Sequence, residues 1–314
     1  DLEGKIAFYN IPMDPSFINT FYAYSNAVKQ RYAGAIEASK KGAIAVVIRS
    51  LSATENIYPH TGSMTYVGAK KKIPAMAIST ADANLLSSHL KDDPELLFKM
   101  RMACEWKDSV QSYNLVADLP GKEKPNEIIL IGGHIDSWDL GTGAHDDGAG
   151  SVHSLEAAWL LKKLDLLPSR TLRVVFFMNE EFGLTGAKEY AKQTELNNWN
   201  HVIAMESDAG GFSPRGISIV APDSIIAKVK SLRALLEPYG IHQFSQTGSG
   251  ADISKIKKDD IVMIGFRPDN HRYFEIHHSA LDNISAVNPR ELELGSATLA
   301  SLIYLLDKYN ITAK

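Results

Sequence analysis

The chain of 314 residues is 45% hydrophobic and 22% charged, which is typical of globular proteins, and it is long enough for about two domains. Its formal net charge of -4, without a long basic run, argues against a nucleic-acid partner, and no apolar run is long enough to span a bilayer. Because Cys104 is the only cysteine, the sequence excludes an intrachain disulfide and a thiolate metal cluster. A metal ion in this protein would therefore have to be bound by His, Asp and Glu.

Residues 1–107 are predicted to form a small domain in which short strands surround one helix. The strands are expected at residues 5–9, 43–48 and 75–78, and the helix at about 31–41. The sequence has no cluster of His, Asp and Glu in this part.

Residues 108–314 alternate between apolar strands and helices. A last helix is marked by Asn288 as its N-cap, with Pro289 in the first turn. Continuous apolar strands between helices indicate a mainly parallel sheet covered on both faces, so the predicted fold class is α/β. The strands are expected at 127–131, 171–178, 201–205 and 260–265, and the other helices at about 150–164, 187–193 and 225–236.

Polar residues follow three of these strands directly. His134 and Asp136 come after the first strand, Glu180 and Glu181 after the second, and Asp208 after the third. Ligands of a parallel sheet bind beyond the carboxyl ends of its strands, so these side chains are expected at one edge. Burying so many carboxylates costs several kcal/mol each, and a divalent cation is the usual compensation. Two cations balance the charge better than one, which predicts a metallohydrolase.

Each motif taken alone also has a purely structural interpretation. Their occurrence together at successive strand ends nevertheless favours a site over coincidence. The structural alternatives are a capping or surface role for His134, a turn at a helix start for Asp146 and Asp147, a solvated pair for Glu180 and Glu181, and loop positions for His277 and His278.

Two other motifs point to different chemistry and fail on particular residues. Gly141-Thr-Gly-Ala-His-Asp146 begins like a dinucleotide-binding loop, but an Asp stands where glycine is needed, and adjacent carboxylates would repel a pyrophosphate. Ser249 lies between two glycines without the spacing of a nucleophile elbow. A serine hydrolase is therefore a weak alternative.

Five motifs, taken in order, resemble the two-zinc exopeptidases that include bacterial leucyl aminopeptidases and glutamate carboxypeptidases. They are Gly132-Gly-His-Ile-Asp136, Asp146-Asp-Gly148, Glu180-Glu-Phe-Gly183, Glu206-Ser-Asp208 and His277-His-Ser279. The resemblance covers nearly the whole chain.

This resemblance implies a zinc exopeptidase catalytic domain over residues 108–314. Residues 1–107 resemble the smaller, β-rich protease-associated domain that this family inserts, through Pro59-His-Thr-Gly62 and Ile73-Pro-Ala-Met-Ala-Ile78. In the family, catalytic-domain sequence precedes that insert. We therefore expect the chain to be truncated or processed.

The same resemblance implies two Zn²⁺ ions per chain. His134 and Asp208 would hold one zinc, Glu181 and His278 would hold the other, and Asp146 would bridge both. Imidazole and carboxylate groups suit zinc, and open positions would leave room for a bridging water.

Further roles are implied for the neighbours of these ligands. Glu180 would be the general base that takes the proton of that water, and His277 would hydrogen-bond the oxyanion. The peptide after the bridging aspartate is often cis in this family, so we predict a cis bond between Asp146 and Asp147.

Two carboxylates are expected to orient the histidine ligands. Asp136 would accept the second N–H of the His134 imidazole and fix its tautomer. Asp282 would do the same for His278.

The implied activity is hydrolysis of small peptides, as an aminopeptidase, a carboxypeptidase or a dipeptidase. The resemblance also implies an extracytoplasmic location, whether secreted, periplasmic or lysosomal, and is compatible with a homodimer. Two alternatives stay open: a glutaminyl cyclase, which shares the fold but uses a single zinc, and a catalytically silent binding relative. The presence of all five ligands and Glu180 disfavours the silent relative.

Overall fold

The computed structural model describes residues 2–246 and 248–313, and the chain divides into two structural units. The first unit contains Asp1–Gln111 together with Trp138–Thr142 and Asn270–Asp282. The second contains Ser112–Ser137, Gly143–Asp269 and Asn283–Lys314. Two short segments from later in the sequence, Trp138–Thr142 and Asn270–Asp282, thus belong to the N-terminal unit. The assignment of this unit as a protease-associated domain stays a prediction.

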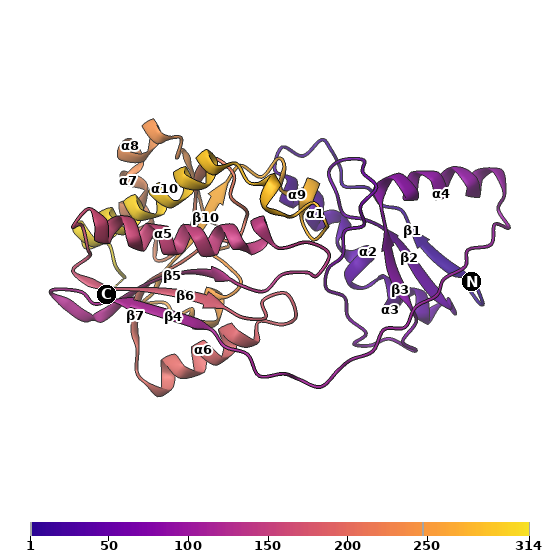
Figure 1. Ribbon diagram of the computed structural model, residues 1–314, viewed down its shortest axis with the longest axis horizontal. Helices are drawn as coiled ribbons and strands as arrows, with labels where there is room; N and C mark the ends of the chain where they lie inside the picture. The colour runs from indigo at the N-terminus through magenta and orange to yellow at the C-terminus, as the bar shows by residue number, and fades with distance from the viewer. Residues whose placement is uncertain (1, 247, 314) are drawn as a thin grey trace. The chain divides into compact units, whose positions relative to one another are not determined.

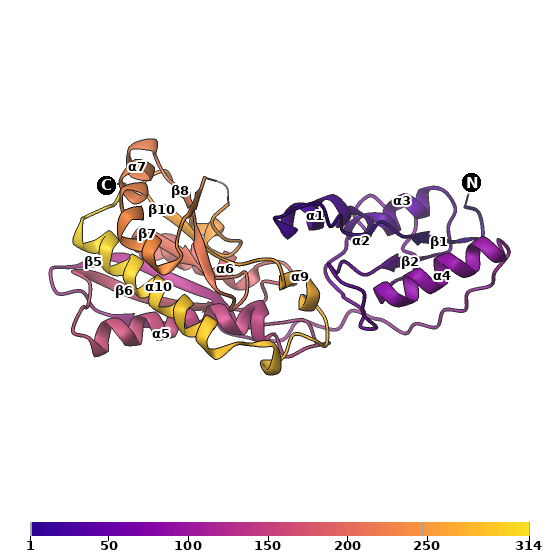
Figure 2. The same ribbon diagram turned by 90° about the horizontal axis from the view of Figure 1, so that it is seen from above.

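The first unit is built on a parallel three-stranded sheet in the order β1-β2-β3. The middle strand, β2, is an aliphatic segment whose first four residues are buried. Helices α3 and α4 lie on opposite faces of this sheet (Figure 2). The elements are β1 (Ile6–Tyr9), β2 (Ala45–Arg49), β3 (Ala75–Ile78), α1 (Thr20–Ala27), α2 (Lys29–Tyr32), α3 (Gly34–Lys40), α4 (Thr80–Asp92) and α9 (Tyr273–Ile276).

The three strands predicted here are confirmed, and the predicted helix at 31–41 corresponds mainly to α3. Helix α4 was not predicted. It starts at the N-cap Ser79, whose hydroxyl oxygen accepts a hydrogen bond from the Asp82 N–H at 2.9 Å. The unit therefore has more helix than its expected β-rich character suggests.

The second unit contains a seven-stranded sheet in the order β4-β6-β5-β7-β10-β8-β9. The four central strands, β6, β5, β7 and β10, are mutually parallel, and antiparallel pairing occurs where β4 joins β6 and where β8 joins β10. The predicted mainly parallel α/β fold is confirmed. The strands are β4 (Leu115–Leu119), β5 (Lys124–His134), β6 (Arg170–Phe177), β7 (Asn200–Glu206), β8 (Pro214–Val220), β9 (Gln243–Ser245) and β10 (Val262–Pro268).

Alternate residues of β5 supply two separate cores on the two faces of the sheet. Ile129 and Ile131 belong to the core that includes residues of helices α5 and α10, whereas Leu130 belongs to the core that includes residues of α6. Figure 1 shows α5 and α10 on one side of the strands and α6 on the other. The helices are α5 (Ala149–Lys163), α6 (Thr185–Leu196), α7 (Asp223–Ser231), α8 (Arg233–Leu236) and α10 (Pro289–Lys308).

The start of α10 agrees with the sequence prediction. The Asn288 side chain accepts hydrogen bonds from the N–H groups of Arg290 and Glu291, and Pro289 occupies the first turn. Within residues 2–246 and 248–313, no helix is both long and apolar enough to span a membrane.

Candidate metal centre

The carboxyl ends of the central strands coincide at one edge of the second unit's sheet. His134 is the last residue of β5 and pairs with Phe177, the last residue of β6. Gly132 of β5 pairs with Glu206, the last residue of β7. The polar residues that follow these strands therefore lie at the same edge, as the sequence predicted.

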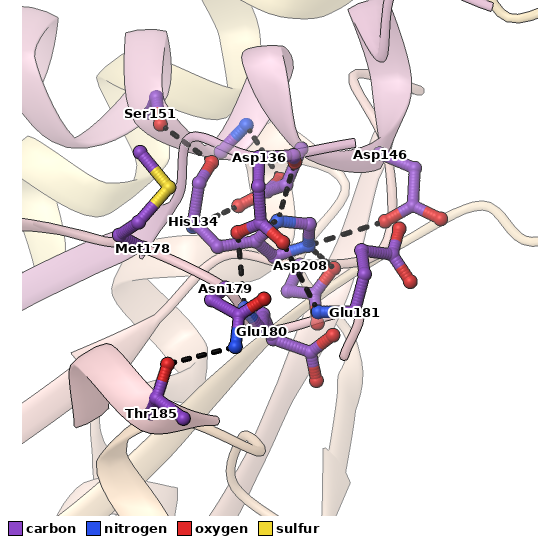
Figure 3. A network of polar contacts seen from close by, with 12 residues as sticks. His134, Asp136, Asp146, Ser151, Met178, Asn179, Glu180, Glu181, Thr185 and Asp208 are labelled. Atoms are coloured by element: carbon purple, nitrogen blue, oxygen red, sulfur yellow. Dashed lines mark hydrogen bonds and ion pairs between the residues drawn. The ribbon is translucent and has the colours of Figure 1, made fainter. Parts of the chain in front are cut away.

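Three of the predicted ligands lie together in this unit. The His134 Nε2 atom is 3.3 Å from Asp146 Oδ1 and 3.6 Å from Asp208 Oδ1. One ligand atom from each of the three residues falls within 4.8 Å of the others. Figure 3 shows the carboxylates of Asp146, Asp208 and Glu181 grouped around the His134 imidazole.

The orientation of His134 is fixed by its other ring nitrogen. Nδ1 lies 2.9 Å from the main-chain carbonyl oxygen of Asp136 and 3.6 Å from the carboxylate oxygen Oδ1 of the same residue. A carbonyl oxygen can only accept, so Nδ1 carries a proton, and in the neutral imidazole the lone pair that binds a metal lies on Nε2. Asp136 does orient the imidazole, but the nearest acceptor is its main-chain carbonyl rather than the predicted carboxylate.

The Asp136 carboxylate instead holds the segment that follows β6. Its Oδ1 accepts a hydrogen bond from the Glu180 N–H at 3.0 Å, and its Oδ2 accepts one from the Glu181 N–H at 3.2 Å. One side chain thus ties the ends of two neighbouring strands together. This bonding fixes the backbone of the predicted general base and of a predicted ligand.

The turn 144–148 between β5 and α5 carries Asp146. The peptide between Asp146 and Asp147 is cis, as predicted. Asp147 is fully buried and accepts hydrogen bonds from the His134 N–H at 3.0 Å and the Gly150 N–H at 2.9 Å. A Cβ atom at Gly133 would lie 2.2 Å from an Asp147 oxygen, so only glycine fits beside this carboxylate.

Sequence reasoning missed two residues that shape this turn. The sequence predicts Asp147 as part of a turn, of the Asp-Asp-Gly motif and of the cis peptide bond, but not its bonds to main-chain N–H groups, which depend on the fold around it. His145 was left without a role. Its Nδ1 accepts a hydrogen bond from the Gly211 N–H at 3.0 Å, and its ring stacks on Phe212 at a centroid distance of 4.4 Å.

The site concentrates negative charge in a buried place. Burial and the nearby charge of Asp208 raise the pKa of Glu180 to about 8 and that of Glu206 to about 7. The same two causes raise the pKa of Asp147 well above its usual value. Although burial opposes protonation, hydrogen bonds to the surrounding aspartates, Asp136, Asp146 and Asp208, raise the pKa of His134 well above its usual range.

Asp252 belongs to the same acidic neighbourhood and was not predicted from the sequence. It is 2% exposed, and among the described residues neither of its carboxylate oxygens has a hydrogen-bond partner. Burial, followed by the charge of Glu206, raises its pKa from 3.8 to about 9. Glu206 itself accepts hydrogen bonds from the N–H groups of Ala251 at 2.6 Å and Ile253 at 2.8 Å, which holds the Asp252 segment beside β7.

We expect Asp252→Asn to stabilise the chelator-treated protein increasingly as pH rises from about 4 to 9. An acid whose pKa is raised in the folded state favours folding below its unfolded pKa of 3.8 and loses that contribution as pH rises towards about 9. Asparagine does not ionise, so the difference in free energy of unfolding between the variant and wild type should widen by at most about 1.4 kcal/mol per pH unit. Thermal unfolding of both proteins at pH 5 and pH 8 measures this difference. An equal difference at the two pH values would contradict the raised pKa of Asp252.

The remaining predicted residues, His277 and His278, follow α9 in the segment Asn270–Asp282 of the first unit. Their rings stack at a centroid distance of 3.5 Å, and His278 has a left-handed backbone with φ of 58°. The place of His278 relative to His134 stays a prediction, and so does the role given to Asp282.

The residues at the sheet edge fit a divalent metal ion by their chemistry. One ring nitrogen of His134 and one carboxylate oxygen each from Asp146 and Asp208 lie within 4.8 Å of one another, which is a nitrogen and oxygen donor set of the kind that zinc accepts. A cation there would also offset the crowding of acids that raises the pKa of Glu180 and Glu206.

Comparison with known proteins decides the family. The sequence model of Peptidase family M28 matches residues 114–303, which is more than half of the chain. The chain belongs to this family. The match covers the part of the sequence that carries His134, Asp146, Glu181 and Asp208 and also includes His278.

Individual relatives agree with this assignment. Carboxypeptidase Q from Bos taurus, also called plasma glutamate carboxypeptidase, is 35% identical over 306 residues, which is 98% of this chain and 63% of that protein. The predicted resemblance to exopeptidases of this type over nearly the whole chain is thus confirmed. The chain spans less than two thirds of the length of this relative.

Solved structures also resemble the chain. The crystal structure of a Peptidase M28 precursor from Shewanella amazonensis superposes with a TM-score of 0.90 at 34% identity, covering 98% of this chain and 69% of that one. A zinc aminopeptidase from Bacillus subtilis, with a TM-score of 0.56 at 18% identity over 97% of this chain and 70% of its own, shares the fold.

Proposed function

We propose that the protein is a two-zinc exopeptidase that hydrolyses small peptides or dipeptides. The observation that carries the proposal is the His134–Asp146–Asp208 cluster at the carboxyl ends of the parallel strands. Glu180 and Glu181 are held at the same edge by the Asp136 carboxylate. Membership in Peptidase family M28 supports the reaction class.

The proposed ligand set divides between the two ions. His134 and Asp208 would hold one zinc, Glu181 and His278 the other, and Asp146 would bridge them. The first half of this set is supported by the distances from His134 Nε2, which are 3.3 Å to Asp146 Oδ1 and 3.6 Å to Asp208 Oδ1. The second half rests on the family resemblance.

The chemistry follows from the side chains around this set. When bound, zinc lowers the pKa of water and polarises a carbonyl group. The Glu180 carboxylate takes a proton from the attacking water and passes it to the leaving amine. The Asp136 carboxylate accepts a hydrogen bond from the Glu180 N–H and so fixes the Glu180 backbone, which limits the positions that the Glu180 side chain can reach. His277 would donate a hydrogen bond to the developing oxyanion.

Glu180 must be ionised to act as the base, which gives the expected pH dependence of the reaction. Burial and the Asp208 charge favour its protonated form and raise its pKa to about 8. Bound cations would favour the carboxylate and lower that value. The acidic limb of kcat/KM is therefore expected below pH 8, with activity rising as pH increases.

The substrate is proposed to be a small peptide, in keeping with the carboxypeptidase and aminopeptidase names of the relatives. By the same resemblance we propose an extracytoplasmic location, with a homodimer as the compatible assembly. We propose no nucleic-acid partner, which the net charge of -4 supports.

A peptide panel with the full-length protein tests the proposed activity. We expect zinc-loaded protein to cleave free dipeptides, to lose this activity with a chelator and to regain it when zinc is restored. N-blocked dipeptides distinguish dependence on the free amino end. Failure of the zinc-loaded protein to cleave any peptide would contradict the proposal and favour a silent binding relative. Cyclisation of N-terminal glutamine with a single zinc would favour a glutaminyl cyclase.

A further inference from the structure

Residues 50–62 of the first unit, the loop after β2, hold the segment that carries His277 and His278. Thr61 and His278 form a reciprocal pair: the Thr61 N–H donates to the His278 carbonyl at 2.9 Å, and His278 Nδ1 lies 3.2 Å from the Thr61 carbonyl oxygen. His60 Nδ1 lies 2.6 Å from the His277 carbonyl oxygen. All of these residues belong to the first unit. Both main-chain carbonyls of the two histidines are therefore fixed by this loop.

These contacts determine where the protons sit. Carbonyl oxygens only accept, so Nδ1 of His278 donates to Thr61, which in a neutral imidazole places the lone pair on Nε2. His134 shows the same arrangement in the second unit, with Nδ1 donating to the Asp136 carbonyl. Histidine ligands of zinc usually donate their second ring N–H to such an acceptor, which orients the ring and sets its tautomer. Thr61 is an acceptor that the sequence prediction for His278 did not consider.

His60 is itself anchored to the sheet of its unit. It is 1% exposed, and its main-chain N–H donates to the Ser50 hydroxyl at 2.8 Å, which in turn donates to the Ile78 carbonyl at 2.7 Å. Because Nδ1 donates to His277, Nε2 can accept from the Asn56 side-chain amide at 3.4 Å. The path from β3 to the His277 backbone is thus continuous through hydrogen bonds.

The Thr61 carbonyl is held from a second side. It accepts a hydrogen bond from Arg31 Nη1 at 3.0 Å, and the other Arg31 nitrogen, Nη2, donates to the Tyr24 hydroxyl at 2.6 Å. The following residue, Gly62, has φ of 143°, and a Cβ atom there would lie 2.3 Å from Arg31 Cζ. Glycine is therefore required next to this carbonyl.

The left-handed backbone of His278 indicates that these bonds determine its conformation. A φ of 58° is uncommon for a residue other than glycine and persists where the surroundings fix it. The bonds of Thr61 to both the carbonyl and the imidazole of His278 supply such surroundings.

We propose that His60 and Thr61 are positioning residues that fix the tautomer and orientation of His278, the zinc ligand proposed within their own unit. This inference rests on the proposed function, because it takes His278 to be a ligand.

Two variants of His60 in the full-length protein test this proposal. His60→Leu removes the donor to His277, whereas His60→Asn keeps a side-chain N–H at the position of Nδ1, from which it can reach the same carbonyl. We expect His60→Leu to weaken one of the two zinc sites by about 10- to 100-fold in competition with a chromophoric chelator. His60→Asn should remain close to wild type, and the absorption spectrum of the cobalt-substituted protein should change only in His60→Leu. The matched control is His89→Leu, an exposed histidine on α4 of the same unit.

The tautomer of His278 gives a readout that needs no variant of His60. In chelator-treated wild-type protein labelled with ¹⁵N-histidine, the His278 signal, assigned by its loss in His278→Asn, should show a protonated Nδ1. A protonated Nε2 would overturn the proposal, as would a folded His60→Leu protein with wild-type zinc affinity and cobalt spectrum. If wild-type protein binds no zinc, the proposed function itself fails, and the tautomer shows separately whether Thr61 orients His278.

Discussion

Glu180→Gln is expected to lower kcat by about 10²- to 10⁴-fold while both zinc ions stay bound, because the amide cannot take the proton of the attacking water. The substitution keeps the size of the side chain and leaves the main-chain bond from the Glu180 N–H to Asp136 in place. Steady-state hydrolysis of a dipeptide, together with metal analysis of the same sample, measures both quantities.

The matched control for this substitution is Glu195→Gln on α6, an exposed glutamate away from the sheet edge. It should keep wild-type activity. Glu180→Gln with an unchanged kcat would remove Glu180 from the mechanism. Loss of zinc in Glu180→Gln would instead make Glu180 a ligand.

Asp146→Asn is expected to weaken both zinc sites together, by about 10²-fold or more each, whereas Asp208→Asn weakens only one. A bridging carboxylate compensates the charge of both ions, and removing one partner from a buried set of charges costs about 3 to 5 kcal/mol. Both residues contact His134 Nε2, so their surroundings are closely matched.

Titration of metal-free variants with zinc in the presence of a competing chelator distinguishes the two cases. Asp146→Asn should show two weakened sites, and Asp208→Asn one weakened site and one of wild-type affinity. If Asp146→Asn weakened only a single site, Asp146 would not be the bridge. Near-ultraviolet circular dichroism of each variant checks that the fold is kept.

The fold and the grouping of His134, Asp146 and Asp208 could be predicted because their sequence signals are local. Strands β5, β6 and β7 are apolar segments that end in polar residues, and parallel pairing brings those ends to one edge. The position of His134 after β5 therefore followed from the sequence. Helix α4 also carries a local signal, because the capping pair Ser79 and Asp82 predicts a helix start at this position.

Other features depend on contacts that no local pattern encodes. Whether His134 donates to the carbonyl or to the carboxylate of Asp136 depends on the backbone path after β5. The buried Asp252, whose carboxylate has no hydrogen-bond partner in the described part of the chain, is recognisable only once the 251–253 segment is placed on Glu206.

The division into units depends in the same way on distant contacts. His60 meets His277 across more than two hundred residues of sequence, and nothing in the Pro59-His-Thr-Gly62 motif indicates that partner. The N-terminal unit therefore gained two segments that the sequence had assigned to the catalytic domain.

The central claim is that this chain builds a site for two zinc ions. The number of zinc ions per chain, measured by plasma mass spectrometry on full-length protein saturated with zinc and freed of excess metal, tests it most directly. We predict two ions per wild-type chain. One ion per chain, or none, would contradict the account.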